Sequence, residues 1–194
     1  CPFGSMASSP HLLALQDFAF DLPPELIAQH PAVERTGSRM LDGTGAVAVD
    51  RMFCDLPGML RAGDLLVFND TQVIKARLFG RKSSGGRVEL LVERVLHETD
   101  AANTVAAHMK ASKKPAAGAV LHMDGGFTAT VLGRWPGAQG ALFRLQLSDD
   151  PYALMARHGH VPLPPYITHA DEADDERRYQ TVFARNPGAL AAPT

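Results

Sequence analysis

The chain has 194 residues, a formal net charge of −2 and an apolar fraction of 45%. This composition allows one large domain or two small ones, and it excludes an overall basic excess, so nucleic-acid binding would need a local patch. The two cysteines make no disulfide framework, and no apolar run reaches the roughly 18 residues of a membrane helix. We therefore expect a soluble, cytoplasmic protein.

The N-terminal part, residues 6–62, mixes short elements with turn residues. The residues before Met6 are typical of a cloning scar, which places the native start at Met6. Pro23 and Pro24 precede an apolar stretch, and proline suits the first turn of a helix, so a short helix is predicted there. Residues 46–49 (Ala-Val-Ala-Val) are a candidate strand.

The middle part, residues 63–147, breaks into short strand-like runs separated by Gly, Asn, Asp or Pro. The predicted strands are Leu65–Phe68, Val73–Phe79, Arg87–Leu96, Thr104–Lys110, Ala119–Met123, Phe127–Leu132 and Ala141–Leu147. Apolar and polar residues alternate in the last run, as in a half-buried strand. The glycine turns Ser83–Gly86 and Asp124–Gly126 indicate hairpins. Strands at this spacing favour a small antiparallel barrel, in which closure removes exposed edges.

After the barrel the period changes. Asp150–Gly159 has an N-cap residue, a proline at the first helical position and a terminal glycine, which predicts a short helix. Val161–Ile167 contains three prolines and is predicted to be extended. The acidic run Asp171–Glu176 is expected to open a helix that continues to Phe183. Because the chain stops at Thr194 on small apolar residues, we expect it to be the front part of a larger protein and inactive alone.

The densest basic segment runs from Lys75 to Arg94, where six cations face two glutamates for a local charge of +4. Lys75 and Arg77 are two residues apart on a predicted strand, so they would share a face with Phe79. Cations beside an aromatic ring suit contact with phosphates and an unstacked base. A solvated outer face of the barrel explains the same pattern, and the residues alone leave both interpretations open.

Two other polar groups have a structural and a functional interpretation. Asn69–Gln72 is typical of turn chemistry, although it would also offer a carboxylate and an amide at a barrel mouth. His158 and His160 have a spacing that metal ligands can use. The other histidines have no matching spacing and no cysteine pair is available to complete a site, so we expect no metal. The sequence has no GxGxxG loop, Walker motif or GxSxG elbow, which argues against a Rossmann-type methyltransferase.

Several long segments resemble, in order, one known family. They are Asp17–Pro31, Gly63–Lys82, Gly85–Arg94, Gly159–Ile167 and Tyr179–Phe183 with Pro187–Thr194. The family is the S-adenosylmethionine:tRNA ribosyltransferase-isomerase of queuosine biosynthesis. Its members continue past the position of Thr194 into a further α/β half. Leu190 and Phe183 replace a common valine and tyrosine without an obvious chemical consequence.

The resemblance implies a fold of the α/β plus β class. A mixed α/β domain would be formed by residues 6–62 and 148–194, with a small antiparallel β-barrel domain inserted at residues 63–147. It also implies the chemistry: the ribosyl moiety of S-adenosylmethionine would join 7-aminomethyl-7-deazaguanine at the wobble position of a tRNA with a GUN anticodon. Rearrangement would give epoxyqueuosine, with loss of adenine and methionine, and a base would remove a proton beside the sulfonium.

Site residues follow from the matching motifs, although the catalytic base stays unassigned. Candidates for binding S-adenosylmethionine or the base are Asn69, Asp70, Thr71, Tyr166, Tyr179, Gln180, Thr181, Pro193 and Thr194. Candidates for binding tRNA are Lys75, Arg77, Arg81 and Lys82. We expect a monomer when full length, with no membrane contact. The alternative is a non-catalytic RNA-binding β-barrel module.

Overall fold

The structure is a computed structural model that describes residues 12–97 and 101–192; Met6, Pro193 and Thr194 therefore lie outside the described residues. The chain divides into two units, Cys1–His30 and Pro31–Thr194. In the first unit, the 3-10 helices η1 (Leu15–Phe18) and η2 (Pro24–Leu26) are single turns, and η2 is the short helix that the proline pair predicts.

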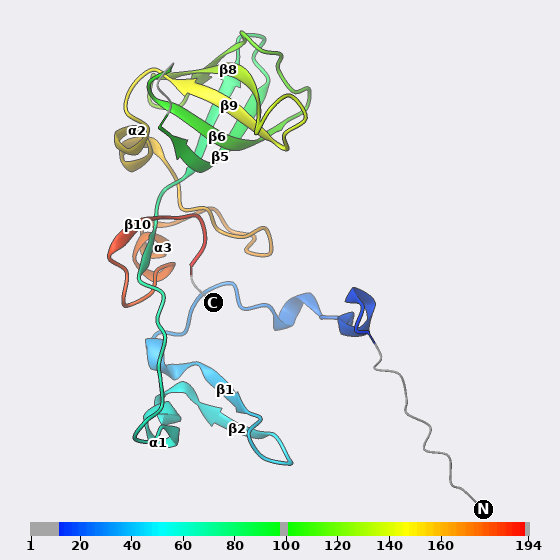
Figure 1. The fold of residues 1–194 in the computed structure, drawn as a ribbon, viewed down its shortest axis with the longest axis vertical. Helices are drawn as coiled ribbons and strands as arrows, with labels where there is room; N and C mark the ends of the chain where they lie inside the picture. Colours follow the sequence, from blue (N-terminus) through cyan, green and yellow to red (C-terminus); the bar gives the residue numbers. More distant parts are fainter. Residues whose placement is uncertain (1–11, 98–100, 193–194) are drawn as a thin grey trace, which may run out of the picture. The chain divides into compact units, whose positions relative to one another are not determined.

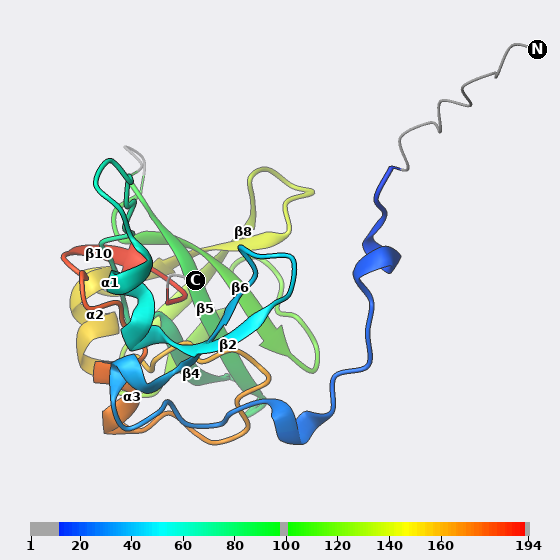
Figure 2. The same ribbon diagram turned by 90° about the horizontal axis from the view of Figure 1, so that it is seen from below.

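The centre of the second unit is a closed six-stranded antiparallel barrel. Its strands are β4 (Arg77–Lys82), β5 (Arg87–Leu96), β6 (Thr104–Ala111), β7 (Val120–Met123), β8 (Thr128–Trp135) and β9 (Leu142–Leu147). The order around the barrel is β4-β5-β6-β9-β8-β7, and β7 closes it against β4. Figures 1 and 2 show the barrel in two views. Both glycine turns join hairpins, β4–β5 and β7–β8, as predicted.

The barrel encloses the hydrophobic core. Buried and outward-facing residues alternate in most of its strands, whereas β6 begins with four consecutive buried residues, Thr104–Ala107. Leu90, Val105, Leu121 and Leu145 are fully buried. Each such side chain contributes roughly 1.5–3 kcal/mol through burial. Helix α2 (Pro151–His158) packs Leu154 and Met155 onto the same cluster, so the core extends past the last barrel strand.

Small sheets and short helices accompany the barrel. Strand β1 (Arg39–Asp42) pairs with β2 (Val49–Met52) in a hairpin, followed by η4 (Phe53–Asp55) and α1 (Leu56–Met59). The remaining elements are η3 (Arg35–Gly37), β3 (Thr71–Val73), α3 (Ala173–Arg178) and β10 (Asn186–Ala189). β3 and β10 pair in parallel although they are far apart in the sequence. The fold is thus a closed β-barrel with further small sheets and few helices.

Several predicted elements were wrong in extent. Leu65–Phe68 is irregular, and the predicted strand Val73–Phe79 is divided into β3 and β4 by Ile74–Ala76, where the Ala76 N–H donates to the Ile74 carbonyl. Strand β2 covers Val49–Met52, whereas the strand predicted from the sequence covers residues 46–49, so the two share only Val49. Helix α3 ends at Arg178 and does not reach Phe183, because Tyr179 leaves the helical conformation; the Arg177 carbonyl there accepts from the Arg35 guanidinium at 3.0 Å.

The division into domains stays a prediction. The first barrel strand begins at Arg77, later than the predicted boundary at Gly63, and the intervening β3 pairs with β10 outside the barrel. None of the described helices is both long and apolar enough to cross a membrane.

Candidate functional site

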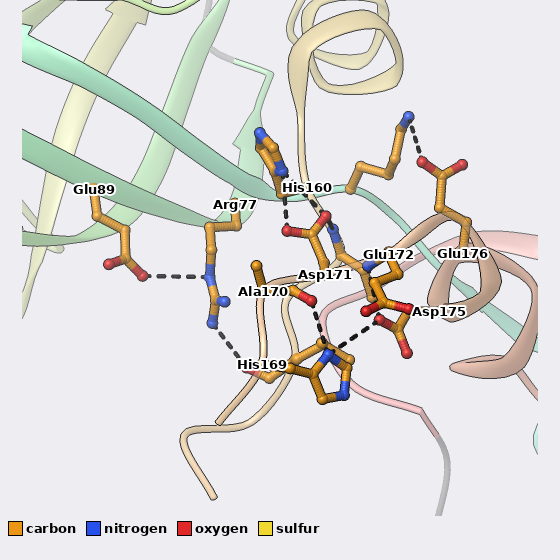
Figure 3. A network of polar contacts seen from close by, with 12 residues as sticks. Arg77, Glu89, His160, His169, Ala170, Asp171, Glu172, Asp175 and Glu176 are labelled. Carbon is orange, nitrogen blue, oxygen red and sulfur yellow. Dashed lines mark hydrogen bonds and ion pairs between the residues drawn. The ribbon is translucent and has the colours of Figure 1, made fainter. Parts of the chain in front are cut away.

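The candidate site lies where β4 meets the segment that follows α2. Arg77 and His160 form an isolated antiparallel bridge, in which the His160 N–H donates to the Arg77 carbonyl at 2.8 Å and the Arg77 N–H donates back at 3.2 Å. This bridge holds the proline-rich stretch Val161–Ile167 next to the barrel. The prediction that the whole stretch is extended was wrong, because it turns at Pro165 and Tyr166, where the Ile167 N–H donates to the Pro164 carbonyl. Polar side chains from β4, β5 and the acidic segment then gather around it (Figure 3).

A histidine–carboxylate pair is the main chemical feature of the site. His160 Nδ1 lies 3.0 Å from both carboxylate oxygens of Asp171, and the Val161 N–H donates to the same carboxylate at 3.3 Å. Because an ionised carboxylate only accepts hydrogen bonds, it selects the tautomer with the proton on Nδ1. The Nε2 atom of a neutral His160 then carries a lone pair that can accept a proton.

An aromatic ring completes the surroundings of this histidine. The Phe79 ring contacts the His160 ring edge-on, with centroids 5.0 Å apart. The His160 side chain is 42% exposed, whereas Asp171 is 17% exposed. The carboxylate is therefore sheltered behind an imidazole that solvent or a ligand can reach.

Arg77, a predicted tRNA ligand, has a guanidinium that binds other residues of the chain. Its guanidinium donates to the Leu163 carbonyl at 2.8 Å, and its Nε lies 3.3 Å from Glu89 Oε1 as an ion pair (Figure 3). The side chain is only 23% exposed. We infer that Arg77 links the barrel to the proline-rich stretch, and its proposed role toward tRNA stays a prediction.

Lys75 lies outside β4, so the prediction that it shares a strand face with Arg77 and Phe79 was wrong. Its ammonium pairs with Glu176 at 3.1 Å. Both residues line an open cleft of about 730 Å³, together with Gln72–Ile74, Tyr152, Met155, Ala156, Val161, Gln180 and Pro187. The lining combines apolar side chains with one ion pair, which suits a small organic molecule.

Gln180 has a defined structural partner at this cleft. Its side-chain amide accepts from the Val73 N–H at 2.9 Å and donates to the Val73 carbonyl at 2.8 Å. The Gln180 side chain therefore makes the two hydrogen bonds that a neighbouring strand would make, on the edge of β3 that β10 does not cover. Thr181 follows and accepts from the Phe183 N–H at 3.3 Å.

The predicted polar loop at Asn69–Thr71 mostly performs turn chemistry. Asn69 Oδ1 accepts from the Thr71 N–H at 2.9 Å, as in an Asx turn. The Asp70 carboxylate accepts from the Asn186 side chain at 2.9 Å, and its carbonyl accepts from the Arg185 N–H at 2.7 Å. The loop thus joins β3 to β10, while its exposed position leaves ligand contact as a prediction.

The two candidate tyrosines lie in different settings. Tyr166 is 58% exposed in the turn of the proline-rich stretch, where the Ile167 N–H donates to the Pro164 carbonyl. Tyr179 is half-buried at the C-terminal end of α3, and its N–H donates to the Asp175 carbonyl. Of the two rings, that of Tyr166 is the more exposed, and base stacking needs a ring that a nucleobase can reach.

Arg81 and Lys82 complete β4 before the hairpin turn. Arg81 is exposed, and within the described part of the chain its guanidinium makes a long contact, 3.5 Å, to the Gly85 carbonyl. Lys82 donates to the Lys113 carbonyl at 3.0 Å. Of the four predicted tRNA ligands, Arg81 is therefore the one with the most freedom to meet an anion.

The acidic segment around α3 also contains contacts between its own residues. His169 Nδ1 donates to the Ala170 carbonyl at 2.8 Å and lies 3.9 Å from Asp175. A hydrogen bond from Arg177 lowers the pKa of the Asp174 carboxyl. Within residues 12–97 and 101–192, no group of three or more His, Cys, Asp or Glu side chains is arranged to hold a metal ion.

Sequence reasoning missed the histidine–carboxylate pair as a unit. His160 was considered with His158 for its metal-like spacing, but His158 instead stacks on Phe127. Asp171 was assigned to the start of a helix. The useful signal was the proline-rich stretch between His160 and Asp171, because its turn at Pro165 and Tyr166 brings the chain back toward His160.

Comparison with known proteins gives consistent matches. A model of the family described as queuosine biosynthesis protein matches residues 15–194. An S-adenosylmethionine:tRNA ribosyltransferase-isomerase of Dechloromonas aromatica (strain RCB) is 55% identical over 184 residues, covering 94% of this chain and 51% of the relative. One from Burkholderia pseudomallei (strain 1106a) is 53% identical over 189 residues, covering 94% and 50%. The chain spans about half the length of these curated relatives.

A solved structure also matches. The crystal structure of an S-adenosylmethionine tRNA ribosyltransferase from Thermotoga maritima is 30% identical and covers 78% of this chain and 52% of that chain. The TM-score is 0.36.

Proposed function

The chain belongs to the family of queuosine biosynthesis proteins, and on that premise we propose that the full-length protein is an S-adenosylmethionine:tRNA ribosyltransferase-isomerase. It moves the ribosyl moiety of S-adenosylmethionine onto 7-aminomethyl-7-deazaguanine at the wobble position of a GUN-anticodon tRNA. The product is epoxyqueuosine, and adenine and methionine leave. The observation that carries the proposal is the 55% identity over 94% of this chain to a relative of that name.

In this proposal S-adenosylmethionine is a substrate that donates its ribose, and no metal takes part. The sulfonium acidifies the carbon beside it, so the reaction begins with removal of a proton by a positioned base. His160 takes this proton on Nε2, and Asp171 is the positioning residue that holds the tautomer. The hydrogen-bond geometry at Nδ1 and the exposed ring support this role.

The direct test is adenine release by the full-length protein, measured by chromatography. Adenine should form from S-adenosylmethionine only when tRNA carries the deazaguanine precursor. Methyl transfer to tRNA without adenine release would overturn the proposal. Binding of tRNA with neither reaction would favour the alternative, a non-catalytic RNA-binding β-barrel module.

The role of His160 has its own test. His160→Gln should abolish most of kcat, and Asp171→Asn should lower kcat and alter its pH profile while substrate binding changes little. His108→Gln is a matched control, since His108 also pairs with a carboxylate, Glu93, at 3.1 Å but lies on the exposed barrel surface. Equal losses in the His160 and His108 variants would remove His160 from the catalytic role.

A further inference from the structure

Two arginines lie side by side on the outer face of the barrel. Arg81 on β4 is directly opposite Arg87 on β5, and on its other side it is opposite His122 on β7. All three side chains are exposed. Like charges directly opposite in a sheet destabilise it, so this row costs the barrel stability unless an anion binds there.

The next row along the strands carries an aromatic ring and a further cation. Phe79 on β4 is opposite Glu89 on β5, which in turn is opposite Lys110 on β6. Phe79 and Arg87 both line two shallow hollows, one of about 290 Å³ that includes Arg81 and one of about 460 Å³ that includes Lys110. The surface is therefore recessed around the ring and edged by three cations.

These three cations are not neutralised within the described part of the chain. Among residues 12–97 and 101–192, neither Arg81, Arg87 nor Lys110 has a carboxylate within ion-pair distance. Glu89, the nearest acidic residue in the register, is already paired with Arg77 at 3.3 Å. Asp124 remains at the edge of the smaller hollow.

We propose that this face, defined by Arg81, Arg87 and Lys110 around Phe79, binds the sugar-phosphate backbone of the tRNA anticodon arm. The inference rests on the proposed function, and it adds a location for the RNA. Cations beside an accessible ring are the combination that holds phosphates next to an unstacked base. It keeps Arg81 from the sequence-based surface and adds Arg87 and Lys110, whereas Lys75 and Arg77 form ion pairs with Glu176 and Glu89.

The position of Phe79 connects this face to the candidate site. The same ring that borders both hollows contacts the His160 ring, with centroids 5.0 Å apart. A backbone held on Arg81 and Arg87 would therefore bring a neighbouring nucleotide to His160. The proposed RNA-binding face therefore lies next to His160, the proposed catalytic base.

The test compares charge-removing variants of the full-length protein. Arg87→Gln and the double variant Arg81→Gln/Arg87→Gln are measured against Arg94→Gln, which changes the same residue type near the other end of β5, where Arg94 lies over Trp135. The dissociation constant for a GUN-anticodon tRNA is determined at several salt concentrations. Binding of S-adenosylmethionine and thermal melting are measured in parallel.

We expect Arg87→Gln to weaken tRNA binding about fivefold and to lower the salt slope by about one unit, with about two units for the double variant. Arg94→Gln should change neither quantity. Unchanged affinity and slope in the double variant, with wild-type turnover intact, would overturn this inference and leave the proposed function standing. If the variants lose tRNA binding but the wild-type protein releases no adenine, this inference stands and the proposed function is overturned.

Discussion

In the described part of the chain, every member of the buried hydrophobic cluster lies between Ala76 and Met155, in the barrel, its connections and α2. The stretch Leu65–Phe68 contrasts with this, because its four large apolar side chains are between 48% and 86% exposed. The Phe68 ring contacts another exposed ring, that of Phe183, with centroids 4.3 Å apart. The same sequence thus contains a barrel with its own core and flanking segments that lack one.

The flanking segments are joined mainly by hydrogen bonds. Arg35 donates to the carbonyls of Gln180 and Arg177 at 2.8 and 3.0 Å, and Arg178 donates to the Val33 carbonyl at 3.1 Å. Two-stranded sheets such as β1–β2 and β3–β10 are marginal in water without a buried face. Since the relatives are about twice as long as this chain, we expect the apolar side chains at Leu65–Phe68 to be covered in the full-length protein.

The largest expected effect is on the free energy of unfolding, and it compares a buried leucine of the barrel with a more exposed leucine of the flanking segments. Leu90→Ala removes a fully buried side chain from the barrel core and should lower the free energy of unfolding by about 2–5 kcal/mol. Leu66→Ala, the matched change outside the barrel, should cost about 0.5 kcal/mol or less, because Leu66 is 48% exposed. Denaturant unfolding measures both. Equal losses would mean that the flanking segments share the barrel core, contrary to the comparison.

A smaller effect concerns the hydrogen bonds that replace a core at β3. Gln180→Ala leaves the N–H and carbonyl of buried Val73 without their partner and should cost about 1–3 kcal/mol. Gln72→Ala, on the exposed side of the same strand, is the control and should be nearly neutral. Unfolding together with S-adenosylmethionine titration separates a structural role from a binding role. A stable Gln180→Ala variant that loses only ligand affinity would support the binding role alone.

The smallest effect tests the β1–β2 hairpin through pH. Hydrogen bonds from the Thr44 hydroxyl and then from Arg51 lower the pKa of Asp42 to about 2. A carboxyl with a lowered pKa in the folded state stabilises it above the unfolded pKa, and this stabilisation is lost as pH falls toward 2. The difference in melting temperature between wild type and Asp42→Asn should therefore shrink between about pH 5 and about pH 2.5. A constant difference would show that Asp42 is not held as described.

The barrel was predictable because its signals are local. Alternating residues and glycine turns identified most of its strands and both hairpins, since period-two burial and turn geometry act over a few residues. Strand β10 was not predicted, because Pro187 and Gly188 disfavour a strand and only pairing with distant β3 stabilises it. Leu65–Phe68 failed in the opposite way: its apolar run favours a strand, but no partner strand is present among the described residues.

The site was less predictable because it depends on register and long-range pairing. The sequence identified Arg81 as a basic surface residue, but only the register places Arg87 opposite it. The sequence made Lys75 and Arg77 candidates for binding tRNA, but it did not indicate that they form ion pairs with Glu176 and Glu89. Charge counts along a segment cannot include an acidic partner that is brought in from another element.

One measurement tests the account most directly: tRNA binding and adenine release, determined side by side for the 194-residue chain and the full-length protein. We predict that the 194-residue chain binds tRNA through its barrel, with weaker binding in the Arg81→Gln/Arg87→Gln variant, but releases no adenine from S-adenosylmethionine. The full-length protein should do both when the tRNA carries the precursor base. Adenine release by the 194-residue chain at the full-length rate, or its absence in the full-length protein, would contradict the account.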